Sequence, residues 1–286
     1  DAKLVINWGR KYPNLISLSA SRDSDLDDPM VRQCHGLVLD MQQRYEIVAR
    51  PFDVFPTLRS DETPMITNWG DILVQERIDG MRFNLYFYRG EWEVATLQTP
   101  DGNDIALTAS QYKTAAALFW EAWSEHCYEL PSAARWGDWC FSWELLCPEK
   151  RNIVQHKNSE LRLIGIRCKN GLELDPFSLH WGEAYGYWLT VQEYAFKSFD
   201  QLIAQFVIND PTQHAGYVLI DPTFSDGEHG FRRIGINHPG FDHLVKIKGK
   251  MTIQRALDLI RKDDVGDLLH HFPEWTETFN LVRHKY

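Results

Sequence analysis

Short runs of alternating hydrophobic and polar residues recur along this chain. The clearest is RFNLYFY at 82–88, where every second side chain, beginning with Phe83, is apolar and the intervening ones are polar or amphipathic. This period of two is typical of a half-buried strand. Arg-Gly at 89–90 supplies a turn into a second such run at 92–97, so the pattern predicts a β-hairpin.

Other short segments are rich in β-branched and aromatic residues and are bounded by Gly, Pro, Asp or Asn, which also indicates strands. These predicted strands cover 36–40, 45–49, 141–146, 161–167, 216–221, 232–237 and 243–248.

Helical periodicity is confined to three segments. It covers 109–127, 198–207 with Ser198 as the N-cap, and 252–262 with Thr252 as the N-cap. The predicted strands and helices do not alternate regularly along the chain as they do in a doubly wound sheet, so we expect an α+β fold built on antiparallel sheets. Strand signals stop after Lys250, which predicts one large domain over 1–250 and a small helical C-terminal appendage over 251–286.

Composition narrows the class of protein. The net charge of -10 over 286 residues argues against a wholly basic nucleic-acid coat, although it is compatible with a local basic groove. No apolar run approaches the roughly 18 residues that span a bilayer, so we expect no membrane association. Five cysteines, an odd number without a Cys-x-x-Cys pair, predict reduced thiols and a cytoplasmic location.

The stretch QERIDG at 75–80 places Arg-x-Asp-Gly immediately before the predicted hairpin. Taken alone, this segment is ordinary, because Asp followed by Gly is common in turns. It lies, however, within an ordered series of motifs: RQCHGLVLD (32–40), ARPFDVFPTL (49–58), ERIDG (76–80), FSWELLCPEKRNIV (141–154), AGYVLID (215–221) and LVKIKG (244–249). This series resembles the adenylating RNA ligases of the phage T4 RNA ligase 1 type, within the covalent nucleotidyltransferase superfamily, over residues 10–250.

The resemblance implies a nucleotidyltransferase (adenylation) domain with antiparallel sheets around a cleft. In that family the lysine of Lys-x-Asp-Gly attacks the α-phosphate of ATP, and the resulting lysyl-AMP passes its nucleotide to an RNA 5′-phosphate. The chemistry needs a nucleophilic amine, cations for the phosphates and carboxylates for a divalent metal. ATP or AMP and Mg²⁺ are therefore the implied cofactors, a nucleotide and RNA are the implied ligands, and a protein partner is compatible with the pattern.

Four positions depart from the family pattern. Arg77 stands at the nucleophile position, and a guanidinium with a pKa above about 12 has no free lone pair for attack, although it can still bind phosphate. Ala215 stands where the family has a carboxylate that helps to hold the metal, which weakens the expected Mg²⁺ site. His35 replaces a phosphate-contacting arginine, and Val54 replaces a lysine.

Other positions keep the family residues. By resemblance, Asp79 and Gly80 belong to the nucleotide site, as does Glu144, which is also the remaining metal ligand. His35 belongs to the same site by its position, although it departs from the family residue. Lys246 and Lys248 lie two apart on a predicted strand, so both face one side, where the resemblance implies contact with the triphosphate. Ile164 or Ile166, with Val218, would flank the base. Each also has a plain structural interpretation: an exposed basic strand face for the lysines, a turn for Asp79 and a paired carboxylate for Glu144.

Three functional hypotheses follow, from different classes. A naturally altered site that binds nucleotide or RNA 5′-phosphate without adenylation accounts for all four departures. An ATP-dependent RNA ligase silenced by substitution at Arg77 accounts for one of them. A structural or interaction domain that binds no nucleotide is the third. The family is enzymatic, but the sequence predicts that this chain as written is inactive.

Overall fold

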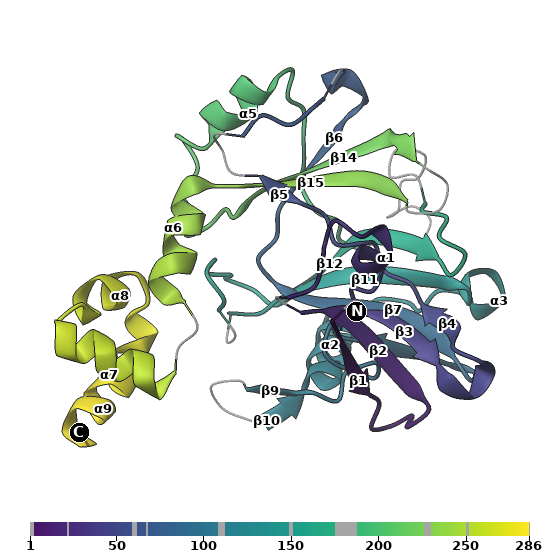
Figure 1. Ribbon diagram of the computed structural model, residues 1–286, viewed down its shortest axis with the longest axis horizontal. Helices are drawn as coiled ribbons and strands as arrows, with labels where there is room; N and C mark the ends of the chain where they lie inside the picture. Colours follow the sequence, from purple (N-terminus) through teal and green to yellow (C-terminus); the bar gives the residue numbers. More distant parts are fainter. Residues whose placement is uncertain are drawn as a thin grey trace.

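The described residues form three larger β-sheets and one two-stranded sheet, with a group of helices at the C-terminal end (Figure 1). The computed structural model describes residues 3–21, 23–58, 62–66, 68–107, 112–148, 151–174, 188–225, 230–249 and 252–285. Within these ranges no helix is long and apolar enough to cross a membrane.

The first sheet has the order β1-β2-β3-β4 and comes from the start of the chain. Its strands are Leu4–Trp8, Leu15–Ala20, Leu37–Asp40 and Glu46–Ala49, and helix α1 (Pro29–Gln33), capped by the Asp28 side chain, joins β2 to β3.

The middle sheet has the order β12-β11-β7-β8 and contains the predicted hairpin. Strands β7 (Met81–Tyr88) and β8 (Glu91–Ala95) are joined at Arg89 and Gly90, whose φ values of 49° and 89° are both positive. Positive φ at both turn residues matches the twist of the strands, so this prediction is confirmed. Strands β11 (Trp139–Leu146) and β12 (Glu160–Cys168) complete the sheet.

The third sheet has five strands in the order β13-β6-β14-β15-β5. They are Glu193–Tyr194, Leu73–Glu76, Gly216–Ser225, Phe231–Asn237 and Thr57–Leu58. All its pairs are antiparallel except β15 with β5. The α+β class with antiparallel sheets is thus confirmed.

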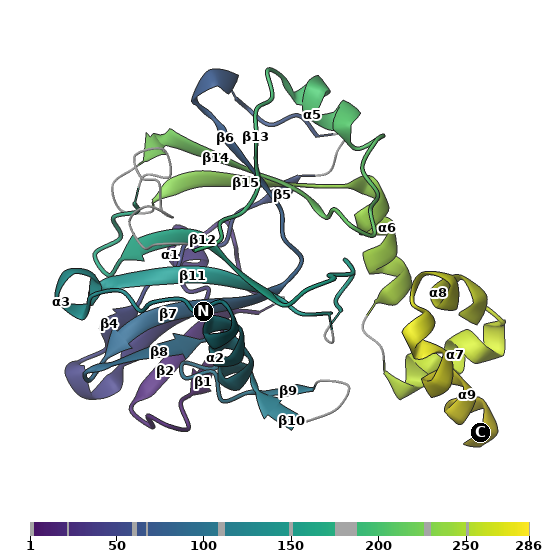
Figure 2. The ribbon, with the colours of Figure 1, turned by 180° about the vertical axis from the view of Figure 1, so that it is seen from behind.

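Apolar side chains bury both faces of the middle sheet. Helix α2 (Ala115–Glu125) packs Phe119 and Trp123 against Phe83 and Trp143 on one face, and Tyr86 on the other face joins the core of the first sheet. Figure 2 shows α2 beside the small hairpin of β9 (Ile105–Leu107) and β10 (Tyr112–Thr114). Helix α3 (Ala133–Trp136) precedes β11.

Two of the predicted helices are confirmed with their caps. Helix α5 (Phe199–Gln205) is capped by Ser198 and covers the five-stranded sheet through Leu202. Helix α7 (Ile253–Lys262) is capped by Thr252. Helix α2 begins only at Ala115 because Thr114 caps it; residues 109–111 of that prediction lie outside the described ranges.

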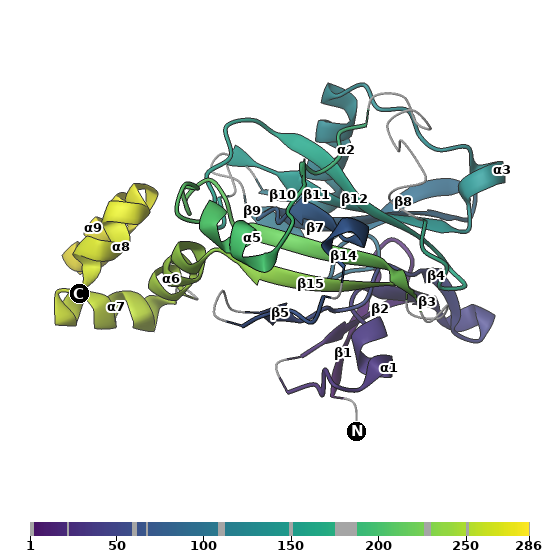
Figure 3. The ribbon, with the colours of Figure 1, turned by 90° about the horizontal axis from the view of Figure 1, so that it is seen from above.

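The predicted strand at 243–248 is wrong, because these residues belong to helix α6 (Pro239–Lys248). The His238 side chain caps this helix, Pro239 suits its first turn, and Phe241 and Leu244 bury one helical face. The β-branched residues of HLVKIK follow a helix start that lies four residues earlier. Helix α6 leads into α7, α8 (Val265–His271) and α9 (Thr276–Lys285), which form one group at an end of the molecule (Figure 3).

Candidate functional site

The Arg-x-Asp-Gly segment connects two sheets. Strand β6 ends at Glu76 in the five-stranded sheet, and β7 begins at Met81 in the middle sheet. Residues 77–80 therefore cross from one sheet to the other, and the sheets position their side chains from both sides. Two hollows meet at this crossing, and both are lined by residues 76–78.

The small hollow has a volume of about 160 Å³. Its lining comes from both sheets and from the segments next to them, and includes Phe52, Gln75, Arg77, Glu144, Ile164 and Val218. The large hollow, of about 350 Å³, lies at the loops beyond β11 and before β14, and it is lined by Arg77, Gln155, Lys157, Arg162, Gln213 and Ala215. Arg77, Glu144, Ile164 and Val218 are thus brought together as the sequence predicted.

The Arg77 side chain lies across strand β15. Its Nη1 donates a hydrogen bond to Thr57 Oγ1 at 3.0 Å, and its backbone N–H donates to the Gly216 carbonyl. A Cβ atom at Gly235 would lie 2.4 Å from Nη1, so the guanidinium passes where β15 has no side chain. Burial lowers the pKa of Arg77. The ordinary pKa of an arginine is so far above neutral that the guanidinium nevertheless stays cationic. No carboxylate of the described residues forms an ion pair with it.

Asp79 does not face either hollow with a free carboxylate. It accepts hydrogen bonds from the backbone N–H groups of Ile153 (2.7 Å) and Val154 (2.9 Å), and from the Asn152 amide. The Asp79 carbonyl also contacts His156 Nε2 at 2.9 Å. Asp79 therefore fixes the loop after β11, and Gly80 next to it leaves room, because a Cβ there would lie 2.8 Å from the Leu145 carbonyl.

Glu144 is buried and already paired. Arg82 Nε donates to its Oε1 at 2.8 Å, and burial raises the pKa of Glu144 while the Arg82 cation opposes that shift. His35 is also close to Arg82, and burial together with this cation lowers the pKa of His35 to about 4. A neutral histidine cannot replace the charge of an arginine at a phosphate.

These residues do not fit a divalent metal site. Glu144 is held by Arg82, Asp79 by the loop, and Ala215 offers no ligand atom. The described part of the chain contains no group of three or more His, Cys, Asp or Glu side chains at metal-binding distances.

Ala215 is buried in an apolar cluster with the C-terminal helices. Its neighbours in that cluster include Val154, Phe241, Leu244 and Phe272. The position at which the resemblance implies a carboxylate is therefore part of the surface on which the helical group packs.

Only one of the two isoleucine candidates lines the small hollow. The β11–β12 pairing shifts register between Ser142 and Trp143, which leaves Ile164 as an extra residue without a partner on β11. This bulge turns Ile164 to the small hollow, while Ile166 is fully buried in the core beneath α2. Val218 lines the small hollow from β14.

Lys246 and Lys248 do not share a face, because two residues on an α-helix are separated by about 200°. Lys248 Nζ donates to the Arg151 and Asn152 carbonyls, and burial lowers its pKa. Lys246 is exposed. Neither is among the described residues that line the two hollows. Val54 lines a separate hollow of about 620 Å³.

Among the residues of the small hollow that sequence reasoning missed, two polar ones bear on its chemistry, Gln75 and Arg233. Gln75 is 4% exposed, and its amide nitrogen has no hydrogen-bond partner among the described residues. Arg233 lies 4.3 Å above the Phe52 ring, with Arg82 also over that ring at 5.0 Å. The motif contained Gln75 as its first letter, but only the strand pairing shows where the side chain lies.

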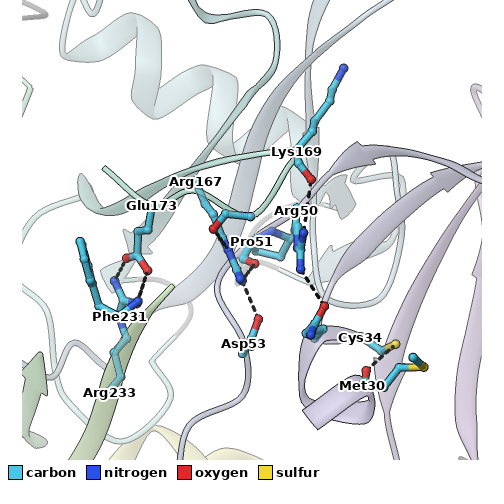
Figure 4. Close-up of polar contacts among 12 residues, drawn as sticks. Met30, Cys34, Arg50, Pro51, Asp53, Arg167, Lys169, Glu173, Phe231 and Arg233 are labelled. Atoms are coloured by element: carbon cyan, nitrogen blue, oxygen red, sulfur yellow. Dashed lines mark hydrogen bonds and ion pairs between the residues drawn. The ribbon is translucent and has the colours of Figure 1, made fainter. Parts of the chain in front are cut away.

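One buried arginine holds Pro51 and Asp53, on either side of Phe52 in the chain, and Arg233 is held by Glu173 (Figure 4). Glu173 pairs with the Arg233 guanidinium and accepts from the Phe231 backbone N–H at 3.0 Å. Arg167 donates to the Pro51 carbonyl at 3.0 Å and pairs with Asp53. These contacts tie β12 of the middle sheet to the segment that follows β4, and the residues after β12 to β15 of the five-stranded sheet.

Comparisons with known proteins agree with this architecture. No family model matches the chain. The chain is 22% identical over 302 residues to an RNA ligase of Rhodothermus phage RM378, an alignment covering 82% of this chain and 65% of that protein, so it spans less than two thirds of that relative. An archaeal ATP-dependent RNA ligase (form 2) matches with a TM-score of 0.57 and 11% identity, covering 97% of this chain and 72% of the other.

A putative ATP-dependent DNA ligase from Aquifex aeolicus matches with a TM-score of 0.55 and 13% identity, covering 86% of this chain and 62% of the other. The predicted resemblance to RNA ligases is confirmed, and the chain has the nucleotidyltransferase fold of ATP-dependent ligases.

Proposed function

We propose that this chain binds a nucleotide, and the 5′-phosphate of an RNA strand next to it, without forming a covalent bond to either. The observation that carries the proposal is the position of Arg77: a guanidinium at the junction of two hollows, with no described carboxylate paired to it. A guanidinium in such a place attracts phosphate through its forked donors. RNA enters the proposal through the similarity to the phage RNA ligase.

The small hollow suits the base of the nucleotide. Its volume of about 160 Å³ is below the roughly 300 Å³ at which sites for whole small molecules begin. Ile164 and Val218 offer apolar contacts, and the Gln75 amide offers a buried hydrogen-bond donor that has no partner among the described residues. An unpaired buried donor costs free energy that a base edge would recover.

The site lacks the nucleophile and the metal ligands that covalent transfer of a nucleotide needs. Arg77 has no lone pair for attack on phosphorus. The residues around it do not fit a divalent metal, because Glu144 is paired with Arg82 and Ala215 is apolar. Binding remains, since neither hydrogen bonding to the base nor phosphate attraction needs those groups.

The hypothesis of a ligase silenced at position 77 makes a different prediction. If Arg77 were the one defect, Arg77→Lys would restore adenylation. We expect this variant to stay inactive, because Ala215 and the Arg82–Glu144 pair are unchanged in it.

Calorimetric titration with ATP tests the proposal. We expect binding by the unaltered protein and a loss of affinity of about tenfold in Gln75→Ala and in Arg77→Ala, as for one hydrogen bond that involves a charged or buried group. Lys246→Ala is the control, because its exposed side chain lies outside both hollows. Absence of ATP binding would favour the structural or interaction domain.

A further inference from the structure

The loop that Asp79 holds is also held from its other side, where it meets helix α6 (Figure 2). Lys248, on the last turn of that helix, donates from Nζ to the carbonyls of Arg151 (3.1 Å) and Asn152. The peptide group between Asn152 and Ile153 is therefore held at both ends, its carbonyl by Lys248 and its N–H by Asp79. A peptide dipole between a cation and an anion polarises in favour of both hydrogen bonds, so the two charged residues fix the loop together.

The C-terminal helices hold the cation side of this arrangement. The Phe272 ring is fully buried, and Lys248 Nζ lies 5.6 Å and the Arg151 guanidinium 4.7 Å from its centroid. A cation is attracted to the face of an aromatic ring, which favours this placement of both side chains. Glu274 accepts from Arg151 Nη1 at 3.3 Å. The loop is thus contacted by the end of α6 and by residues at the end of α8 and just after it.

Movement of this loop would reach the nucleotide site through Asp79. The loop contributes Val154 to the wall of the large hollow. Asp79 lies two residues from Arg77, on the segment that crosses between the sheets. If the loop moved away, the Asp79 carboxylate would lose the N–H groups that offset its charge. An uncompensated anion within the Debye length of about 10 Å repels phosphate.

We propose that Lys248 and Phe272 form a clamp through which the C-terminal helices position the Asp79 loop, so that nucleotide affinity depends on helices outside the nucleotide site. Neither residue is among the described residues that line the two hollows, so they act as positioning residues through 151–154. The dependence on nucleotide rests on the proposed function. Because coupling between two sites is reciprocal, bound ATP must strengthen the packing of the helices by the same factor.

Hydrogen exchange and calorimetric titration with ATP test the clamp in matched lysine variants. In Lys248→Met we expect faster exchange of the Ile153 and Val154 amides and a loss of ATP affinity of about fivefold, which is at the low end of couplings between sites. Lys246→Met removes an exposed lysine from the same helix and should change neither. Lys248→Arg keeps a cation with several donors and should retain most of the affinity.

Reciprocal coupling provides a measurement that a purely structural role of Lys248 would not affect. Saturating ATP should slow exchange of the Phe272 and Phe279 amides in the unaltered protein and should have little effect on them in Lys248→Met. In an Asp79→Ala background, Lys248→Met should cause little further loss of ATP affinity, because the clamp acts through Asp79.

Two results would overturn the inference. Equal ATP affinity in Lys248→Met and in the unaltered protein would show that the helices do not influence the nucleotide site. A lower urea midpoint with unchanged exchange at Ile153 and Val154 would show that Lys248 stabilises the helices without positioning the loop.

The same data separate this inference from the proposed function. ATP binding that does not respond to Lys248→Met refutes the clamp and leaves the proposed function standing. Faster exchange at Ile153 and Val154 in Lys248→Met, in a protein that binds no ATP, supports the clamp on the loop and refutes the nucleotide site.

Discussion

Replacing Asp79 by alanine should release the loop that forms a wall of the large hollow. The carboxylate accepts from the N–H groups of Ile153 and Val154, which are residues only 2% and 4% exposed, and from the exposed side chain of Asn152. Leaving a buried donor unpaired costs about 1–3 kcal/mol. For the two backbone amides together, with partial access of water to them, we expect the free energy of unfolding to fall by roughly 2–4 kcal/mol. The contact with Asn152 adds little because that side chain is exposed.

Hydrogen exchange measures this effect at the site, and urea unfolding measures it for the whole protein. In Asp79→Ala we expect faster exchange of the Ile153 and Val154 amides and a lower urea midpoint. Asp79→Asn keeps one acceptor oxygen and should lose about half as much stability. The control is Asp25→Ala, because the Asp25 carboxylate accepts, within the described part of the chain, only from the exposed Asp27 N–H. Unchanged exchange at Ile153 and Val154 would refute the role assigned to Asp79.

Three further predictions concern the surroundings of the site. Ala215→Glu should lower the free energy of unfolding by about 2–4 kcal/mol and so lower the urea midpoint, because it places a carboxylate in the apolar cluster under the C-terminal helices; an unchanged midpoint would contradict this packing. Burial lowers the pKa of His35 and of His214 to about 4, from 6.5. Between pH 4 and 6.5 the unfolded chain therefore binds more protons than the folded one, so stability should fall as pH decreases from about 6.5 to about 4. His214→Phe should show a smaller fall in stability over this range. An equal fall would contradict the lowered pKa of His214. Gly235→Ala should displace the Arg77 guanidinium, since the added methyl would lie 2.4 Å from Nη1, and calorimetry should show weaker ATP binding with little change in stability.

Local patterns in the sequence predicted the elements that local chemistry determines. The hairpin of β7 and β8 follows from alternation and from Arg89-Gly90, and the caps at Ser198 and Thr252 begin helices as expected. Strand β6 was not predicted, because Leu73–Glu76 shows no alternation of apolar and polar residues and is fixed by pairing with β14.

The site required long-range contacts that no local pattern contains. The order of motifs brought Arg77, Glu144 and Val218 to one place, but the side of β12 on which Ile164 lies depends on a bulge opposite β11. Helix α6 replaced the expected strand because His238 begins it and because its apolar face packs on the C-terminal helices. Asp79 was expected in the nucleotide site, and its partners lie more than 70 residues away along the chain.

Retention of α-labelled ATP before and after denaturation tests the central claim most directly. The protein is incubated with the label and magnesium, and bound label is counted on a filter and again after denaturing electrophoresis. We predict label on the native protein, a loss of about tenfold in Arg77→Ala, and none on the denatured chain. Label that survives denaturation would contradict the account by revealing another nucleophile, and absence of label on the native protein would contradict nucleotide binding itself.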